Sequence, residues 1–194
     1  INEDELVQGL KSSISPKFKT EDIETLAKRD EDGTYEKKAT CLFDYTKFKH
    51  TNERTANKGI LFSIASTVAA FMNTDGGNIL IGVFDEKEIN NYNLEGDDIF
   101  FGIDEDIKLK QNNKDKLLEH INTTITDMIG RAASACYTVS FESYKDKQLC
   151  LITVAKNITN KTYHGKEKIF YIRNGSSDKK LLGDEIDTYW KARI

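Results

Sequence analysis

The chain has 194 residues, of which 38% are apolar and 31% are charged, as is typical of one globular domain with a substantial core. No segment approaches the roughly 18 consecutive apolar residues of a membrane-spanning helix, and the N-terminus lacks the pattern of a secretory signal. The cysteines (Cys41, Cys136 and Cys150) are odd in number and lack metal-ligand spacing, which favours reduced thiols in a cytoplasmic protein.

The net charge of −4 argues mildly against a nucleic-acid-binding surface, because such surfaces are usually basic. The charges are, however, unevenly distributed along the chain. Acidic residues gather at 95–106 and 184–187, whereas lysines gather at 108–116, 156–168 and 179–180. Two interpretations therefore stay open: the lysines form a basic face on an acidic protein, or they are scattered over a solvated surface.

The N-terminal part of the chain differs from the rest. Residues 2–12 have the apolar spacing of a short amphipathic helix. A second helix is predicted to begin at the N-cap Thr20, with Asp22 in its first turn. We interpret residues 1–29 as a helical arm outside the main domain, which comprises residues 30–194.

The centre of the chain predicts a helix followed by a buried strand. In residues 59–73, apolar side chains recur at the three- and four-residue spacing of one helix face. Asn73 is expected to cap this helix with its side chain or to adopt a left-handed conformation, and the Gly76–Gly77 pair allows a tight reversal. Residues 78–84 then form an apolar strand with Asp85 at its far end.

A second amphipathic helix is predicted at residues 115–129, with Gly130 as its C-cap. The other predicted elements are a strand at 35–45, a polar loop at 47–58, a polar connection at 90–106, strands at 137–141 and 148–154 around a turn at 144–147, a strand at 168–173 and a closing helix at 183–191. This order predicts an α/β fold in which two main helices pack on a mixed β-sheet.

Several motifs of this chain resemble those of the AlbA-like domain of the Schlafen family. The helix ending in Asn-Thr-Asp-Gly-Gly at 73–77 and the strand ending in Gly-Val-Phe-Asp at 82–85 have the order and spacing of the family signature. Glu31 and Glu36 resemble its opening Glu-x4-Glu motif, and residues 171–177 resemble its closing Tyr-x-Arg-x-Gly-Ser-Ser motif. The resemblance implies that this chain forms a single AlbA-like lobe.

The chain also departs from the family pattern. Lys37 stands where the family usually has Phe, and an insertion that includes residues 46–58 separates the first motif from the central helix. A competing alignment of the first motif uses residues 41–44 and would lose a glutamate. Downstream, residues 101–106 resemble a Gly-Ile/Leu-x-x-Asp segment of the family.

The resemblance brings together three carboxylates, those of Glu31, Glu36 and Asp85. In the nuclease members of the family, carboxylates at the matching positions bind a divalent metal and support RNA cleavage. Hard oxygen ligands suit Mg²⁺ or Mn²⁺, which can activate water and neutralise charge on a phosphate. The alternative is that these residues are ordinary acidic residues at strand ends.

Nucleic-acid contacts are expected from Lys38, Arg173, Ser176 and Lys179. Lys38 should lie on the same strand face as Glu36, because side chains alternate along a strand. Arg173 is a candidate phosphate contact, because a guanidinium can donate two parallel hydrogen bonds to phosphate oxygens. The alternative is that Arg173 forms a structural ion pair. Ser176 could donate to phosphate or shape a turn.

Three functions are therefore compatible with the sequence. The first is a metal-dependent endoribonuclease, and the second is a non-catalytic DNA-binding or oligomerisation module of a larger regulator or antiviral defence protein. The third is a protein–protein scaffold. The resemblance implies RNA or DNA as the partner and favours a homodimer, because two lobes form the groove of Schlafen nucleases. No Lys-Ser or Lys-Thr follows the glycine pair, so ATP is not expected.

Overall fold

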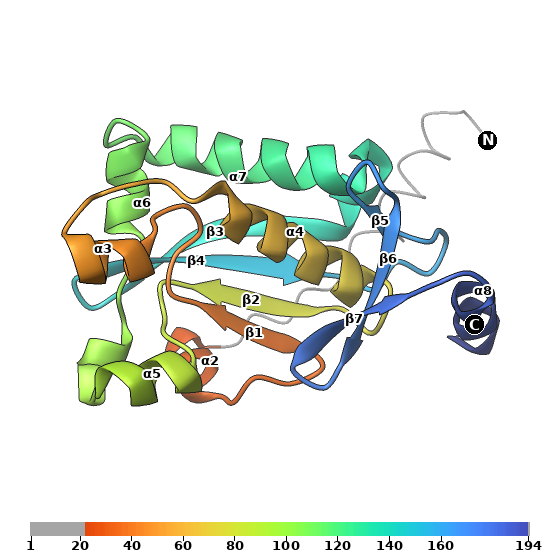
Figure 1. The fold of residues 1–194 in the computed structure, drawn as a ribbon, viewed down its shortest axis with the longest axis horizontal. Helices are drawn as coiled ribbons and strands as arrows, with labels where there is room; N and C mark the ends of the chain where they lie inside the picture. Colours follow the sequence, from red (N-terminus) through yellow and green to blue (C-terminus); the bar gives the residue numbers. More distant parts are fainter. Residues whose placement is uncertain (1–21, 194) are drawn as a thin grey trace, which may run out of the picture.

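The computed structural model describes residues 22–193 and contains two β-sheets with helices packed around them (Figure 1). The helix expected at residues 2–12 and the expected N-cap Thr20 lie outside the described residues. The first described helix is α2, Ile23–Lys28. Its N-cap is Asp22, which accepts hydrogen bonds from the backbone N–H groups of Glu24 and Thr25, so the expected place of Asp22 in the first turn was wrong.

The larger sheet has the strand order β1-β2-β4-β3, with β1 at Tyr35–Lys38, β2 at Gly77–Ile81, β3 at Tyr137–Tyr144 and β4 at Lys147–Val154. β1 and β2 are parallel, and the other neighbouring pairs are antiparallel. The predicted mixed sheet is therefore confirmed. A parallel pair needs a crossover connection, which here contains the helix α4, Lys58–Met72.

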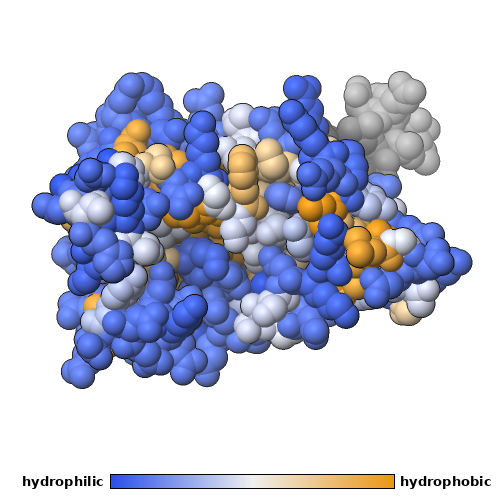
Figure 2. Space-filling model, viewed as in Figure 1, coloured by the Kyte–Doolittle hydropathy of each residue, from blue (hydrophilic) through white to orange (hydrophobic). Residues whose placement is uncertain are grey.

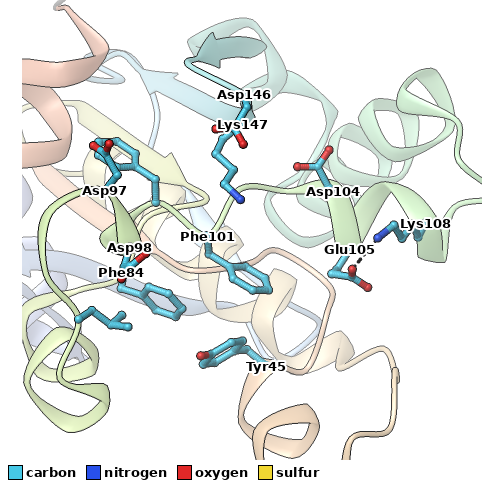
Figure 3. A pocket seen from close by; sticks show the side chains of 12 residues that line it. Tyr45, Phe84, Asp97, Asp98, Phe101, Asp104, Glu105, Lys108, Asp146 and Lys147 are labelled. Carbon is cyan, nitrogen blue, oxygen red and sulfur yellow. Dashed lines mark hydrogen bonds and ion pairs between the residues drawn. The ribbon is translucent and has the colours of Figure 1, made fainter.

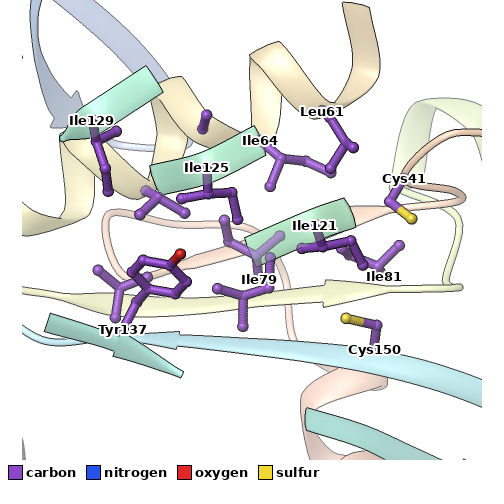
Figure 4. Packing of buried hydrophobic residues seen from close by; sticks show 14 of the residues in the cluster. Cys41, Leu61, Ile64, Ile79, Ile81, Ile121, Ile125, Ile129, Tyr137 and Cys150 are labelled. Carbon is purple, nitrogen blue, oxygen red and sulfur yellow. The ribbon is translucent and has the colours of Figure 1, made fainter. Parts of the chain in front are cut away.

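Two long helices cover one face of this sheet, as predicted. Figure 1 shows α4 and α7, Lys114–Ile129, lying across the same face. Ile79 and Ile81 of β2 point toward these helices and pack with Ile64 of α4 and with Ile121 and Ile125 of α7 (Figure 4). Each such buried side chain contributes about 1.5–3 kcal/mol to the hydrophobic stabilisation of the fold.

The opposite face of the sheet has its own, smaller core. Tyr35 of β1 and Leu80 of β2 point to this side, where they pack with Leu26 of α2 and with Leu149 and Leu151 of β4. The alternation between the two faces follows from the two-residue period of a strand. It also places Glu36 and Lys38 on the face that α4 covers.

A second sheet was not predicted. It consists of β5 at Tyr163–His164, β6 at Ile169–Asn174 and β7 at Ser177–Leu181, in that order. The strand expected at 168–173 is present as β6, but it pairs with β5 and β7 rather than with the larger sheet. The closing helix is confirmed as α8, Asp184–Arg193.

Two segments that were expected to be irregular contain helices. The strand expected to extend to Tyr45 ends at Lys38, and the helix α3, Tyr45–Thr51, occupies part of the expected loop. Asp44 initiates α3 by accepting from the N–H of Lys47 at 2.8 Å. The connection after β2 contains α5 at Glu86–Tyr92, the 3₁₀ turn η1 at Gly96–Ile99 and α6 at Asp104–Leu109, and η2 at Arg131–Cys136 follows α7.

None of the described helices has the length and apolar character needed to cross a membrane.

Asn73 joins the end of α4 to the second sheet. Its backbone is right-handed, with φ −80°, and its side chain does not cap α4, so both expected roles were wrong. The buried amide instead accepts from the N–H of Thr162 at 2.9 Å and donates to the carbonyls of Thr162 and Tyr171 at 2.7 and 2.9 Å. The left-handed residue is Gly76, at φ 77°, where an added Cβ would lie 2.6 Å from the carbonyl oxygen of Val154.

Replacement of Asn73 by alanine should lower the free energy of unfolding by about 2 kcal/mol, because it leaves the buried polar groups of Thr162 without their partner. Urea denaturation measures the difference. Asn90→Ala, at an exposed position of α5, is the matched control and should change stability by less than about 0.5 kcal/mol. Equal stability of the two variants would show that the amide does not join the helix to the sheet.

Candidate functional site

A group of charged side chains gathers at β1, the edge strand of the larger sheet. Glu36 and Lys38 lie on the face that α4 covers, and the Lys38 ammonium donates to Glu36 Oε1 at 2.5 Å. The expectation that the two side chains share a face is therefore confirmed. The side chain of Glu36 is only 9% exposed and that of Lys38 is 27% exposed, so solvent screens their ion pair weakly.

Glu31 precedes β1 and closes the open edge of that strand. Its Oε1 accepts from the N–H of Lys37 at 2.7 Å, where a neighbouring strand would otherwise bind. Burial raises the pKa of Glu31 above its ordinary value, and the charges of Glu36 and Asp85 raise it further. The hydrogen bond from Lys37 and the charge of Lys38 act in the opposite direction.

Asp85 approaches the same group from the start of α5. As the N-cap, it accepts from the N–H of Glu88 at 2.7 Å, and Glu88 accepts from the N–H of Asp85 at 3.2 Å. This reciprocal arrangement is a capping box, which fixes both carboxylates. Burial raises the pKa of Glu88, and Asp85 and Glu31 raise it further. Sequence reasoning missed Glu88, although the Asp-x-x-Glu spacing of a capping box could have revealed it.

The charges of nearby carboxylates change the pKa of the Lys38 ammonium. Burial alone would lower its pKa, but Glu36, Glu31 and Asp85 all raise it, and the pKa lies above its ordinary value. Lys38 therefore stays charged at neutral pH. The structure thus brings the three expected carboxylates together with Glu88 around Lys38. We call the four carboxylates, Glu31, Glu36, Asp85 and Glu88, the carboxylate cluster.

The carboxylate cluster has the oxygen ligands that Mg²⁺ or Mn²⁺ prefers, but its side chains are arranged around protein groups. Glu36 is bound by Lys38 and Arg173, and Asp85 is bound by a backbone N–H. Within residues 22–193, no three side chains of His, Cys, Asp or Glu are placed to hold a metal ion. The donor chemistry fits a divalent cation, whereas the present side-chain arrangement does not.

Arg173 lies beneath the cluster rather than at the surface. Its side chain is 1% exposed, and it donates to Glu36 Oε2 at 3.0 Å, to Asp178 Oδ1 at 2.8 Å and to the carbonyl oxygen of Asp32 at 2.9 Å. The guanidinium also lies over the ring of Phe71. This is the structural ion pair that the sequence analysis gave as the alternative to a phosphate contact, and it fixes the orientation of Glu36.

The other expected nucleic-acid contacts lie on the β6–β7 hairpin. Ser176 is exposed in its turn, and Lys179 is exposed on β7. Among the described residues, neither side chain is hydrogen-bonded to the carboxylate cluster. Figure 2 shows a hydrophilic surface over α5, whose N-terminus carries Asp85.

The segment at 101–106 has a structural role. Asp106 is fully buried, and its Oδ1 accepts from the N–H groups of Leu42 and Phe43 at 2.6 and 2.7 Å and from that of Cys41 at 3.3 Å. These bonds hold the loop that leads from β1 to α3. Burial raises the pKa of Asp106 to about 6. Asp44, which the competing alignment would use, is the N-cap of α3.

Comparison with known proteins identifies the family. Residues 31–182 match the family Schlafen, AlbA_2. The chain therefore belongs to this family, and the resemblance inferred from the motifs is confirmed. No protein with a curated description matches the sequence.

Two solved structures are similar to the chain. One is the DIP2311 protein from Corynebacterium diphtheriae, with 15% sequence identity and a TM-score of 0.54 over 98% of this chain and 29% of that chain. The other is the N-terminal domain of a RecG-related protein from Nitrosomonas europaea, with 22% identity and a TM-score of 0.45 over 82% of this chain and 90% of that domain. The first supports the fold. This chain spans about 29% of that protein's length.

Proposed function

We propose that this domain binds nucleic acid and that Glu31, Glu36 and Asp85 bind Mg²⁺ or Mn²⁺ to support endoribonucleolytic cleavage. The observation that carries the proposal is the largely buried pair of Glu36 and Lys38, 2.5 Å apart, together with Glu31, Asp85 and Glu88, whose charges act on Lys38 or on one another. Membership of the Schlafen AlbA_2 family supports the same conclusion.

The charge of the cluster provides the physical argument. Glu31, Glu36, Asp85 and Glu88 would repel a phosphate, and Lys38 with the buried Arg173 offsets only part of their charge. The raised pKa values of Glu31 and Glu88 reflect this excess of negative charge as well as burial. A divalent cation would relieve the repulsion and would make the same position attractive to a phosphodiester.

Each residue then has a distinct role. Arg173 holds Glu36 in place through Oε2, and Glu88 holds the backbone of Asp85. Lys38 donates to Glu36 Oε1 in the present arrangement, and if Glu36 were to hold a cation, the ammonium would be free to donate to a phosphate oxygen. Ser176 and Lys179 contact the nucleic-acid backbone. The bound ion would supply charge neutralisation and an activated water.

Metal binding can be tested without nucleic acid. Mn²⁺ titration followed by electron paramagnetic resonance should show a site in the wild-type protein that Asp85→Asn weakens by at least about tenfold, because one charged ligand is lost. Asparagine retains the N-cap, so α5 should stay folded. Glu86→Gln, at the exposed neighbouring position, is the control and should bind Mn²⁺ like the wild type. Equal affinity of all three proteins would contradict the assignment.

The alternative is a non-catalytic nucleic-acid-binding or oligomerisation module of a larger regulator or defence protein, acting as a homodimer. One observation favours it: Lys38 already balances Glu36, so the cluster can be stable without a metal. This alternative predicts DNA or RNA binding that weakens steeply with salt, with no cleavage product. Fluorescence anisotropy with labelled single-stranded DNA and RNA over a range of salt concentrations measures that dependence.

A further inference from the structure

A pocket lies apart from the carboxylate cluster. An open pocket of about 670 Å³ is formed where the start of α3, the segment from η1 to α6 and the turn between β3 and β4 meet (Figure 3). None of Glu31, Glu36, Lys38 or Asp85 lines it. Its volume falls in the range of pockets that hold small ligands or several side chains of a partner.

One wall of the pocket is aromatic. Tyr45, Phe84 and Phe101 lie together on one side of the view in Figure 3. The ring of Tyr45 meets those of Phe84 and Phe101 edge-to-face, with both pairs of centroids 4.9 Å apart. Phe101 also stacks on Phe43, which is fully buried. Such packing holds the rings in fixed orientations, so they form a rigid surface for a ligand.

Most of the other lining residues are charged, with five carboxylates and two lysines. Glu105 is paired with Arg54 and Lys108, and Asp97 is paired with Lys145. Asp98, Asp104 and Asp146 form no ion pair with any residue of the described part of the chain. The negative charge of the pocket is therefore only partly compensated by the protein itself.

The position of Lys147 indicates which chemistry the pocket accepts. Figure 3 shows its side chain extending from the start of β4 into the pocket, with the ammonium directed toward Phe101. Within residues 22–193, this ammonium has no ion-pair partner. The pocket therefore accommodates the ammonium of one basic side chain that has no ion-pair partner in the described part of the chain.

We propose that this pocket docks an arginine side chain from a basic peptide segment of a partner protein. The guanidinium stacks on Tyr45 or Phe101 and pairs with Asp98, which lies beside Phe84, or with Asp104, which lies across the pocket (Figure 3); neither carboxylate is ion-paired within residues 22–193. Arginine fits better than lysine, because its planar group both stacks on a ring and binds carboxylates through two N–H groups. The complementary charge of the pocket selects a basic partner over an acidic or neutral one.

The test uses a fluorescein-labelled nine-residue peptide with one central arginine among glycine and serine, and the same peptide with neutral citrulline. Fluorescence anisotropy at low salt, with EDTA present, should show binding of the arginine peptide only. The double variant Asp98→Asn/Asp104→Asn and the variant Tyr45→Leu should each bind it about tenfold more weakly. Lys147→Ala should bind it more tightly, because the competing ammonium is removed.

A control with the same change in net charge is Glu119→Gln/Asp127→Asn, two exposed positions on α7. It should bind the arginine peptide like the wild type, and thermal unfolding should show that all variants are folded. The proposal is overturned if both double variants lose the same affinity, if citrulline replaces arginine without loss, or if spermine binds while the peptide does not. The last result would assign the pocket to a small polyamine.

Discussion

Replacing Arg173 with methionine is expected to lower the free energy of unfolding by about 3–5 kcal/mol, the largest effect of any single substitution considered for this domain. The guanidinium is 1% exposed and is the buried partner of both Glu36 and Asp178. Methionine fills similar space but leaves Asp178 without a cation and Glu36 with Lys38 alone. The cost is therefore mainly that of incompletely compensated buried charge, because the side chains of Glu36 and Asp178 are only 9% and 17% exposed.

A double-mutant cycle separates this cause from lost packing. Arg173→Met/Glu36→Gln removes one of the two buried carboxylate charges that the first substitution leaves incompletely compensated, so it should be more stable than Arg173→Met alone. Lys179→Met, on the exposed side of β7, is the control and should change stability by less than about 0.5 kcal/mol. Urea denaturation of the wild type, Arg173→Met, Glu36→Gln and the double variant gives the coupling. A double variant that is as unstable as the sum of its parts would show that Arg173 acts by packing.

The second large effect is expected at Asp106. Asp106→Leu keeps the shape of the side chain but removes the oxygen that accepts from the N–H groups of Cys41, Leu42 and Phe43. The resulting unsatisfied donors should cost on the order of 3 kcal/mol. Asp106→Asn retains an acceptor at that position and should be markedly more stable than the leucine variant. Chemical denaturation at pH 7 compares the two, and equal stability would mean that the hydrogen bonds do not hold the loop.

The same residue gives the fold a defined pH dependence. The pKa of Asp106 is raised to about 6 in the folded protein, whereas an unfolded aspartate has a pKa of about 4. The folded state binds this proton more tightly, so the contribution to stability is complete below about pH 4 and is lost as the pH rises through about 6. The change amounts to about 3 kcal/mol. The stability of Asp106→Asn relative to the wild type should therefore increase from pH 4 to pH 7, and a constant difference would contradict the buried-carboxylate account.

The elements with strong apolar periodicity could be predicted from the sequence. α4, β2, α7 and the β3–β4 hairpin are present with small differences in their bounds, because each buries a regular set of apolar side chains. The second sheet could not be predicted in the same way. β5 has two residues and β7 has the polar sequence Ser-Asp-Lys-Lys-Leu, so neither carries a recognisable pattern. α3 was missed because its apolar side chains pack among loop aromatics rather than in the main core.

The candidate site was predictable where it depends on strand alternation and motif spacing. Glu36 and Lys38 share a face because they are two residues apart in β1, and Asp85 lies at α5 as an N-cap. The pairing of Arg173 with Glu36 joins residues 137 positions apart, and no local pattern indicates it. The contacts of Asn73 could not be predicted for the same reason, since Tyr171 lies on β6 and Thr162 directly precedes β5, and the sequence did not predict the sheet that contains these strands.

The most direct test of the proposed function is cleavage of labelled tRNA and single-stranded DNA by the purified protein with Mn²⁺, Mg²⁺ or EDTA. The account predicts RNA cleavage that requires the metal, disappears in Asp85→Asn and persists in the neighbouring control Glu86→Gln. Cleavage that survives in Asp85→Asn or in EDTA would contradict the assignment of the carboxylate cluster. Binding without cleavage in the wild type would instead establish a recognition module, in which Lys38 and the carboxylates only stabilise the edge of the sheet.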